Sequence, residues 1–451
     1  MVVGGTSTIP FAERKFIYNK QENPIKSMGY GVYQTPIFIT MEGDTAQKSI
    51  IFAGIISSFE VSNTGGVVIA TIDLQGATRI LDREEKSASY QNIQMTYETL
   101  IVNTCRQYDE CICDLNCGNN DAIGQLIVQY KETDWEFMKR MSSHFHQPVI
   151  PSFGRKGIYF QFGLNTKLLS HELQVNSYKC GNAKEEYIEK SKNNLQTIRP
   201  DDFTYYIVES RDYYDLGEAI TFRGEQWYIY EANTEYKTGE LLHTYVLRKM
   251  GGFVQNRIDN YALVGASLDA SVLETERDNV KIHLNIDNMQ DISKALYFPY
   301  STVYSSSDGT GWFCMPEVGD RVRLYFPNEK EENAYVISSI HQEVDNSSGQ
   351  IPRSNPDKKS ISNKYQKQIE LTPSSIMMTN NKGMSIVLDD DKGITIKSDK
   401  KVYIKADDNI TIKSDSVMNV KASKSIEFKQ GNNKILMKDQ IMVESSRLKV
   451  Q

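Results

Sequence analysis

The chain has 451 residues and a formal net charge of -7, and 39% of its residues are hydrophobic, values typical of a soluble protein with more than one domain. Its C-terminal lysines are spaced among aspartates instead of forming a patch with aromatic partners, so nucleic-acid recognition is not expected. Residues 1–10 lack a basic segment followed by an apolar core, and the most apolar stretch, residues 49–59, is too short to cross a membrane as a helix. We therefore expect a protein that is made in the cytoplasm without a signal peptide.

The first hundred residues are predicted to form strands. Runs rich in β-branched residues alternate with Gly, Asn, Ser and Asp, which is typical of an antiparallel barrel. These runs cover residues 36–40, 49–54, 57–61 and 66–74.

The sequence pattern then changes to a helical period. Residues 132–141 predict a helix with Thr133 as its N-cap and with acidic Asp134 and Glu136 in its first turn. Apolar side chains three residues apart share one face of this helix, namely Trp135, Met138 and Met141. We expect a helical insert near residues 93–145 that packs on a barrel.

Strands are expected again beyond this insert. The runs at 157–163, 218–222, 226–231 and 243–247 predict a second barrel-like subdomain, and a third β segment follows the Gly251-Gly252 break. Four parts are therefore expected: a region with two β-barrel-like subdomains and the helical insert, a small barrel, a polar linker with a neck, and a repeat. Their ranges are 1–260, 261–344, 345–384 and 385–451.

Four of the six cysteines lie close together in the sequence, namely Cys105, Cys111, Cys113 and Cys117. Their spacing lacks the paired Cys-x-x-Cys of common zinc sites, although His144 and His146 follow nearby. Reduced cysteines, a structural metal site and a disulfide all remain open. A catalytic thiol is not expected.

The last part of the chain repeats with a period of eight residues. Five units follow one another without insertion, at 394–397, 402–405, 410–413, 418–421 and 426–429. Each unit is apolar at its first and third positions, then has Lys, and then turn-forming residues. The alternation puts the apolar pair on one face of a short strand. The ten apolar positions are Ile394, Ile396, Val402, Ile404, Ile410, Ile412, Met418, Val420, Ile426 and Phe428.

A unit this small cannot bury its apolar face alone, so the repeat must pack against copies of itself. An eight-residue unit fits one side of a triangular prism to which three chains each supply one side. The ten positions then form the core of a trimeric, triple-stranded β-helix. Weaker units at 386–388 and 435–443 extend the pattern, and the rod would be on the order of 40 Å long. The alternative is a Lys-rich linker, which has no reason to keep this apolar spacing.

Two motifs carry a resemblance to a known family. The OB-fold motif, P-x-x-G-D-x-V-x-V-x-F, resembles the oligonucleotide/oligosaccharide-binding (OB) module of contractile phage tail spikes and of the valine-glycine repeat protein G of type VI secretion. It consists here of Pro316, Gly319, Asp320, Val322 and Phe326. The hub helix motif, Q-Y-x-E-(S/T)-D-x-x-F-x-x-R, resembles the start of a helix in the baseplate-hub half of the same proteins. It covers Gln129, Tyr130, Glu132, Asp134, Trp135, Phe137 and Arg140.

This resemblance implies a mainly β fold with hub β-barrels and some helix, an OB-fold neck and a C-terminal triple-stranded β-helix. It also implies a homotrimeric hub and spike at the tip of a contractile tail, as in a phage, a phage-tail-like bacteriocin (tailocin) or a secretion device. Sheath contraction would drive the needle into the target cell envelope. The implied partners are the tail tube or a tube-initiator protein and the surrounding baseplate proteins, and the protein would belong to a virion or extracellular particle.

The chain departs from this family in two respects. The linker of roughly twenty residues has no room for an inserted hydrolase domain, and no His follows His341 to form an iron-binding tip. A small tip protein of the PAAR type would then cap the spike. No cofactor is expected, and the carboxylates Asp389, Asp390 and Asp391 are interpreted as a solvated turn, with cation binding as the alternative. The alternative functions are a spike with peptidoglycan-hydrolase activity and a trimeric receptor-binding fibre.

Overall fold

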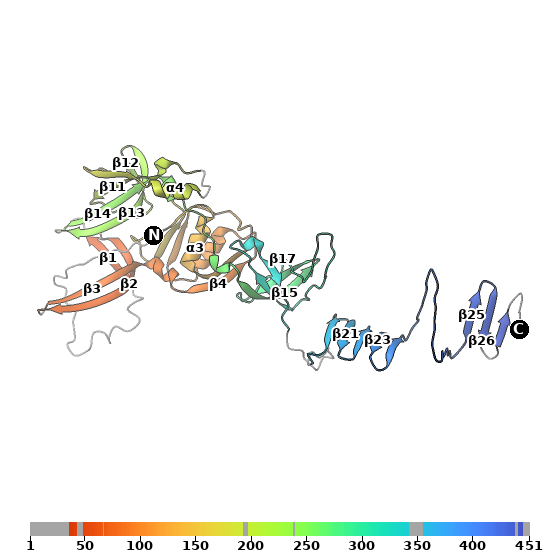
Figure 1. The fold of residues 1–451 in the computed structure, drawn as a ribbon. Helices are drawn as coiled ribbons and strands as arrows, with labels where there is room; N and C mark the ends of the chain where they lie inside the picture. The colour runs from red at the N-terminus through yellow and green to blue at the C-terminus, as the bar shows by residue number, and fades with distance from the viewer. Residues whose placement is uncertain are drawn as a thin grey trace. The chain divides into compact units, whose positions relative to one another are not determined.

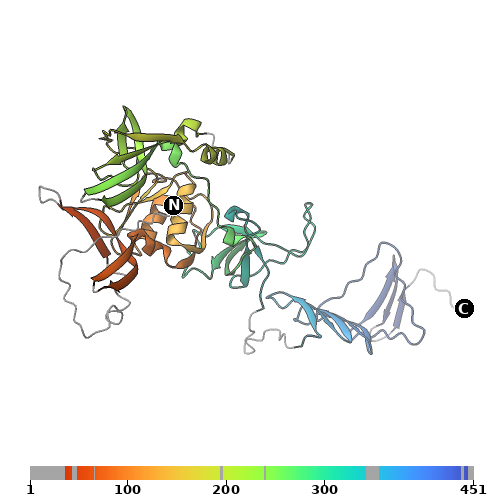
Figure 2. The same cartoon turned by 60° about the vertical axis from the view of Figure 1, so that its left-hand side comes forward.

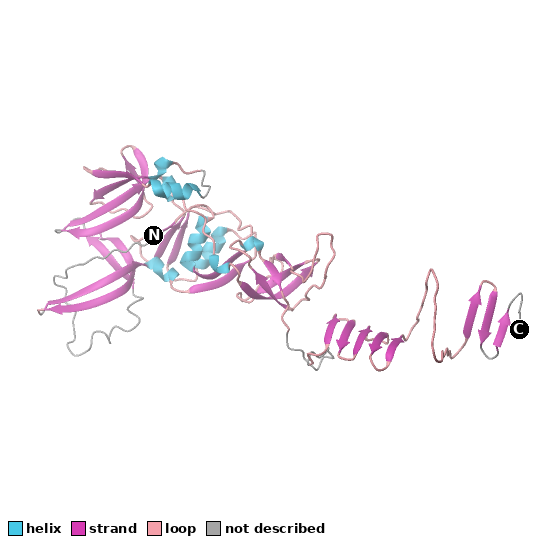
Figure 3. Ribbon diagram, viewed as in Figure 1, coloured by secondary structure: helices cyan, strands magenta, loops and turns pink. Residues whose placement is uncertain are grey.

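The computed structural model describes residues 36–42, 48–65, 67–192, 197–237, 240–341, 355–437 and 441–444. Strands dominate these residues, and the helices among them are short (Figure 3). The fold is therefore mainly β, as the sequence predicts. The chain divides into two units, Met1–Gln342 and Glu343–Gln451.

The first described sheet of unit 1 is a three-stranded antiparallel meander in the order β1-β2-β3. Its long hairpin pairs β2 with β3 from Gly54↔Gly76 to Thr64↔Val67. The strands are β1 (Pro36–Glu42), β2 (Lys48–Thr64) and β3 (Val67–Gly76).

A helical layer follows in the range that the sequence assigned to the insert. Helix α3 begins at Asp134 and is capped by Thr133, whose side chain accepts the Glu136 N–H while the Glu136 side chain accepts the Thr133 N–H. The predicted start of this helix is thus confirmed. The helices are α2 (Tyr97–Cys105) and α3 (Asp134–Ser143). The nearby strands are β4 (Glu85–Tyr90) paired with β6 (Ile127–Thr133), and β5 (Cys111–Leu115), β7 (Val149–Pro151) and β8 (Ile158–Phe162), which form a sheet of their own.

The next subdomain is a six-stranded sheet in the order β10-β11-β14-β13-β12-β9. Its core is rich in aromatic rings, such as Tyr206 against Trp227 with centroids 4.9 Å apart. Its elements are β9 (His171–Glu172), β10 (Tyr178–Asn182), β11 (Thr204–Ser210), β12 (Ala219–Phe222), β13 (Glu225–Lys237), β14 (Glu240–Arg248) and helix α4 (Lys184–Lys192).

Unit 1 ends in a five-stranded sheet in the order β17-β16-β15-β18-β19. A bridge between Tyr300 and Val336 brings the two outer strands of this sheet together. Alternate residues of the long strands point into an apolar core, as the burial pattern of β16 shows. The strands are β15 (Ser267–Glu276), β16 (Asn279–Leu284), β17 (Tyr297–Pro299), β18 (Arg321–Tyr325) and β19 (Tyr335–Ile337). We call this sheet the OB module (Figure 1).

The strands that the structure describes in unit 2 form two antiparallel meanders (Figure 2). The first holds β20 (Lys359–Ser362), β21 (Gln368–Thr372), β22 (Ser375–Thr379), β23 (Ser385–Asp389) and β24 (Gly393–Lys397). The second holds β25 (Ile426–Gln430), β26 (Asn433–Met437) and β27 (Ile441–Glu444). Strands thus begin at Lys359, inside the range that the sequence assigned to the linker and neck.

The middle of the repeat differs from the expectation of one strand per octad. The first and last of the five units lie in β24 and β25, but residues 398–425, all of which the structure describes, hold no strand. Short strands need neighbours that cover their apolar side. A single chain does not supply that cover for the three central units.

Candidate functional site

The seven residues of the hub helix motif lie together, because β6 runs directly into α3. Gln129 is buried and donates through Nε2 to the Glu132 carbonyl at 3.1 Å and to Asp134 Oδ1 at 2.9 Å. The ring of Phe137 is fully buried and stacks on Tyr90, and Trp135 meets Phe160 edge to face. The motif therefore fixes the turn from strand to helix.

Arg140 lies at the centre of this arrangement, with only 1% of its surface exposed. It donates to both carboxylate oxygens of Glu132 at 2.8 Å, and its Nη2 also donates to the Val128 carbonyl at 2.9 Å. Its Nη1 donates to Glu331 Oε1 at 2.8 Å. Burial opposes the charge, but the hydrogen bonds and charges of Glu132 and Glu331 outweigh it and raise the pKa of Arg140 above its ordinary value.

Asp134 forms a second buried polar group in the same motif. Its carboxylate accepts hydrogen bonds from Lys86 Nζ at 2.5 Å, from the Tyr108 hydroxyl at 2.6 Å and from Gln129. These partners come from β4, from the segment after α2 and from β6. The carboxylate is fully occupied by structural contacts, which agrees with the sequence interpretation of Asp134 as a charge at a helix start.

Several contacts join the region of the hub helix motif to the OB module, across the boundary between these two parts of unit 1. Glu331 belongs to the short turn between β18 and β19, so its bond to Arg140 crosses this boundary. Asn260 donates to the Tyr130 carbonyl at 2.9 Å, and Gln91 donates to the Ile282 carbonyl at 3.1 Å. Leu126 and Val128 of the hub side pack into the OB core. We call this boundary the hub–OB junction, and nothing in the sequence marks Glu331 as a part of it.

The OB-fold motif shapes the turn before β18. Pro316 accepts a hydrogen bond from Thr275 at 3.0 Å, and Gly319 has φ +90°, a backbone conformation that favours glycine. The Asp320 carboxylate accepts the Glu317 N–H at 2.9 Å and closes the turn. Val322 and Phe326 are fully buried in the core of the module. These five residues thus have structural positions.

The first meander of unit 2 has one continuous apolar face, which we call the octad face. The strand registers place large apolar side chains opposite one another, for example Ile386↔Ile396 and Leu388↔Ile394. All of these side chains are exposed, Ile394 by 72%. The face consists of Ile361, Ile369, Leu371, Ile376, Met378, Ile386, Leu388, Ile394 and Ile396. A contiguous exposed surface of this kind marks an interaction site.

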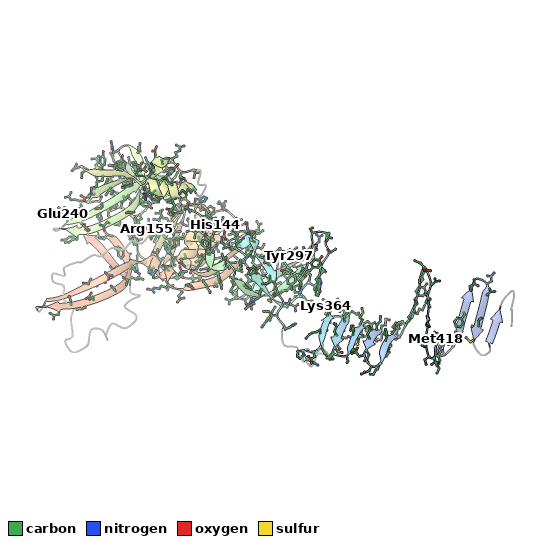
Figure 4. The ribbon with its side chains drawn as sticks, viewed as in Figure 1. His144, Arg155, Glu240, Tyr297, Lys364 and Met418 are labelled. Atoms are coloured by element: carbon green, nitrogen blue, oxygen red, sulfur yellow. The ribbon has the colours of Figure 1, made fainter. Side chains whose placement is uncertain are left out.

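The ten predicted core positions are almost entirely uncovered in the single chain. Ile394 and Ile396 belong to the octad face, Ile426 and Phe428 lie in β25, and the other six lie in the stretch without strands, as Figure 4 shows for Met418. Ile426 is half-buried, and the remaining nine are exposed. The structure therefore does not bring all ten together within one chain.

The cysteine cluster has no disulfide among the described residues, because all six cysteines are free. The described residues also contain no group of three or more His, Cys, Asp or Glu side chains that could hold a metal ion. The two nearby histidines have other partners: His144 lies 2.7 Å from the Tyr97 hydroxyl and His146 lies 3.0 Å from the Gln255 carbonyl. Burial lowers the pKa of His144 to about 3.

A small cavity of about 120 Å³ lies beside β8 and β12, and its lining includes Asp114, Arg155, Asp215 and Glu218. Burial raises the pKa of Glu218. Asp215 accepts hydrogen bonds from the Ser152 hydroxyl and from the Leu216 N–H, so it has structural partners. The cavity is well below the usual 300 Å³ or more of a ligand site.

Comparisons with known proteins agree with this arrangement. Residues 270–341 match the family model of the type VI secretion system/phage-baseplate injector OB domain. The chain is similar to the hub and spike proteins of contractile injection systems. The matched OB domain lies within the part that the sequence assigned to the OB fold, residues 261–344. No curated protein matches the sequence.

Solved structures extend the likeness beyond the OB domain. A lidless complex of PdpA with VgrG matches with a TM-score of 0.50 at 10% identity, over 83% of this chain and 89% of that one. The Escherichia coli c3393 protein, described as a type VI secretion component, matches with a TM-score of 0.47 at 14% identity, over 67% and 86%. The 43 kDa tail protein of prophage MuSo2 from Shewanella oneidensis matches with a TM-score of 0.36 at 10% identity, over 48% and 89%. At such identities the first match shows a shared fold, so the likeness to the VgrG complex concerns the fold alone.

Among the described residues, no helix is both long and apolar enough to span a membrane.

Proposed function

We propose that three copies of this chain assemble through their octad faces into a spike, which the hub joins to the tube of a contractile tail or secretion particle. In this assembly each chain supplies one side of a three-sided prism, with its apolar face turned to the common axis. The observation that carries the proposal is the continuous, uncovered apolar face of the first meander.

The hydrophobic effect supplies the driving force. Burying one Ile or Leu side chain completely contributes about 1.5–3 kcal/mol, so the exposed parts of the apolar side chains on three octad faces can together offset the rotational and translational cost of association. The central octads, which lack strands in a single chain, gain the neighbouring surfaces that they need. A prism of three interlocked chains resists compression along its axis, which suits a part that is pushed through an envelope.

The partners follow from the likeness to baseplate proteins. We propose that the hub contacts the tail tube or a tube-initiator protein and the baseplate proteins around it, and that a small PAAR-like protein caps the spike. The particle, whether a phage tail, a tailocin or a secretion device, would carry the protein to the target cell envelope. The role is mechanical, and the hub–OB junction transmits force through a buried ion pair and a shared core.

Charged substitutions on the octad face test this proposal. In the double variant Ile394→Asp/Ile396→Asp, three copies would bring six carboxylates to the axis, so we expect the full chain to lose its trimeric mass in light scattering. The matched control is Thr395→Asp/Lys397→Gln, which lowers the net charge of the same octad by the same two units on the opposite, polar face of β24. If the double variant and the control have equal masses, the octad face does not hold the assembly together.

A further inference from the structure

A long hairpin projects from the OB module, and Figures 1 and 2 both show it reaching away from the sheet that holds β15 and β17. Its two arms pair at the Ser305↔Gly311 bridge, and the Trp312 N–H donates to the Tyr304 carbonyl at 2.9 Å. The turn contains Asp308, which accepts hydrogen bonds from Thr310. We call the two arms and their turn hairpin 301–313.

Both faces of hairpin 301–313 carry apolar side chains. The bridge places Tyr304 opposite Trp312 on one face and Val303 opposite Phe313 on the other. All four are exposed, Val303 by 88% and Phe313 by 75%. An isolated two-stranded hairpin is only marginally stable in water, and it needs a packing partner to stay ordered. The arrangement predicts that other surfaces cover the hairpin from both sides.

The hairpin begins at the end of the OB module from which the chain continues toward the repeat. The Ser301 N–H donates to the Val336 carbonyl at 2.7 Å, and Val336 lies in β19, the last strand of the module. Beyond β19, the Ile340 N–H is still bound to the Arg321 carbonyl. Three chains joined by their repeats would therefore hold their hairpins close to one another.

We propose that hairpin 301–313 packs against the neighbouring copies of this chain and buries its two apolar pairs between OB modules. This inference rests on the proposed trimer and adds a second contact between its chains, outside the repeat. The occupant is a second copy, because the same chain already presents an apolar face that needs copies of itself, and the hairpin base adjoins the strand that leads there.

The exposed thiol of Cys314, directly after the hairpin, provides a probe for this contact. Thiol labelling of the native full chain, measured by peptide mass spectrometry, is compared with labelling of the full-length Ile394→Asp/Ile396→Asp variant. We expect Cys314 to react about tenfold more slowly in the native assembly. Cys180, which is also exposed but lies on β10, is the internal control and should react equally in both proteins.

A second variant tests how strongly the hairpin contact stabilises the assembly. We expect Val303→Ser/Phe313→Ser to leave the mass of the assembly unchanged but to speed its dissociation by more than about tenfold. The matched control is Leu169→Ser, which alters a side chain that is 90% exposed in another part of unit 1. Equal Cys314 labelling in both proteins of the labelling experiment, or unchanged dissociation of Val303→Ser/Phe313→Ser, would overturn the inference while the trimer stands. A monomeric native chain would instead overturn the proposed function itself.

Discussion

Arg140 brings a permanent charge into the protein interior, where an unpaired guanidinium would cost several kcal/mol. Glu132 lies eight residues before it in the chain and provides a bidentate acceptor, a pairing that the hub helix motif already contains. Glu331 completes the set from 191 residues away. The local pair could be expected from the sequence because both residues border one strand-to-helix turn. The distant partner could not, because no periodicity or spacing connects it to the motif.

The contribution of the buried ion pair to stability can be tested by substitution. Glu331→Ala leaves one N–H of Arg140 without an acceptor in the interior, so we expect a loss of about 3 kcal/mol in the free energy of unfolding. The measurement is urea unfolding of the full chain, followed in the transition that includes unit 1. The neighbouring Glu332 is exposed, and Glu332→Ala should change the free energy by less than about 0.5 kcal/mol. Equal losses in the two variants would mean that the junction does not depend on this ion pair.

Elements with strong local sequence signals are found in the structure where the sequence predicts them. Helix α3 begins at Asp134 because Thr133 can cap it, and the strands of the OB module follow the alternation that places Val322 and Phe326 inside. The three central octads show the opposite case. Their alternation indicates strands, but a strand also needs neighbours, and a single chain offers none that cover the apolar side. The sequence pattern therefore predicts more strands in this stretch than the single chain forms.

The cap of α3 can be tested directly. Thr133→Ala removes the acceptor for the Glu136 N–H and the hydroxyl that donates to Asp82 at 2.7 Å, so we expect a loss of about 1–2 kcal/mol in stability. Thr133→Ser keeps the hydroxyl and serves as the control. Hydrogen exchange of the amides in the first turn of α3 should rise in the Ala variant and stay near the native rate in the Ser variant. Unchanged exchange in the Ala variant would contradict a role for this cap.

In the molecule as a whole, the two units differ in how far they expose their apolar side chains to solvent. Unit 1 has buried cores with a continuous connection across the hub–OB junction. The described residues of unit 2 expose nearly every large apolar side chain that they contain. Exposed apolar surface of this extent is typical of an interaction site. This difference is what we expect if unit 1 folds by itself and unit 2 completes its fold only when copies of the chain associate.

The mass of the unmodified full-length chain in solution, measured by light scattering over a range of concentrations, tests the central claim most directly. We expect a mass of three chains that does not fall on dilution, because the octad faces and the hairpins would hold the chains together. One chain mass at all concentrations would contradict it and would favour the interpretation of the repeat as a linker. Two chain masses would contradict the three-sided prism, since a pair of facing sheets would then be sufficient to cover the octad faces.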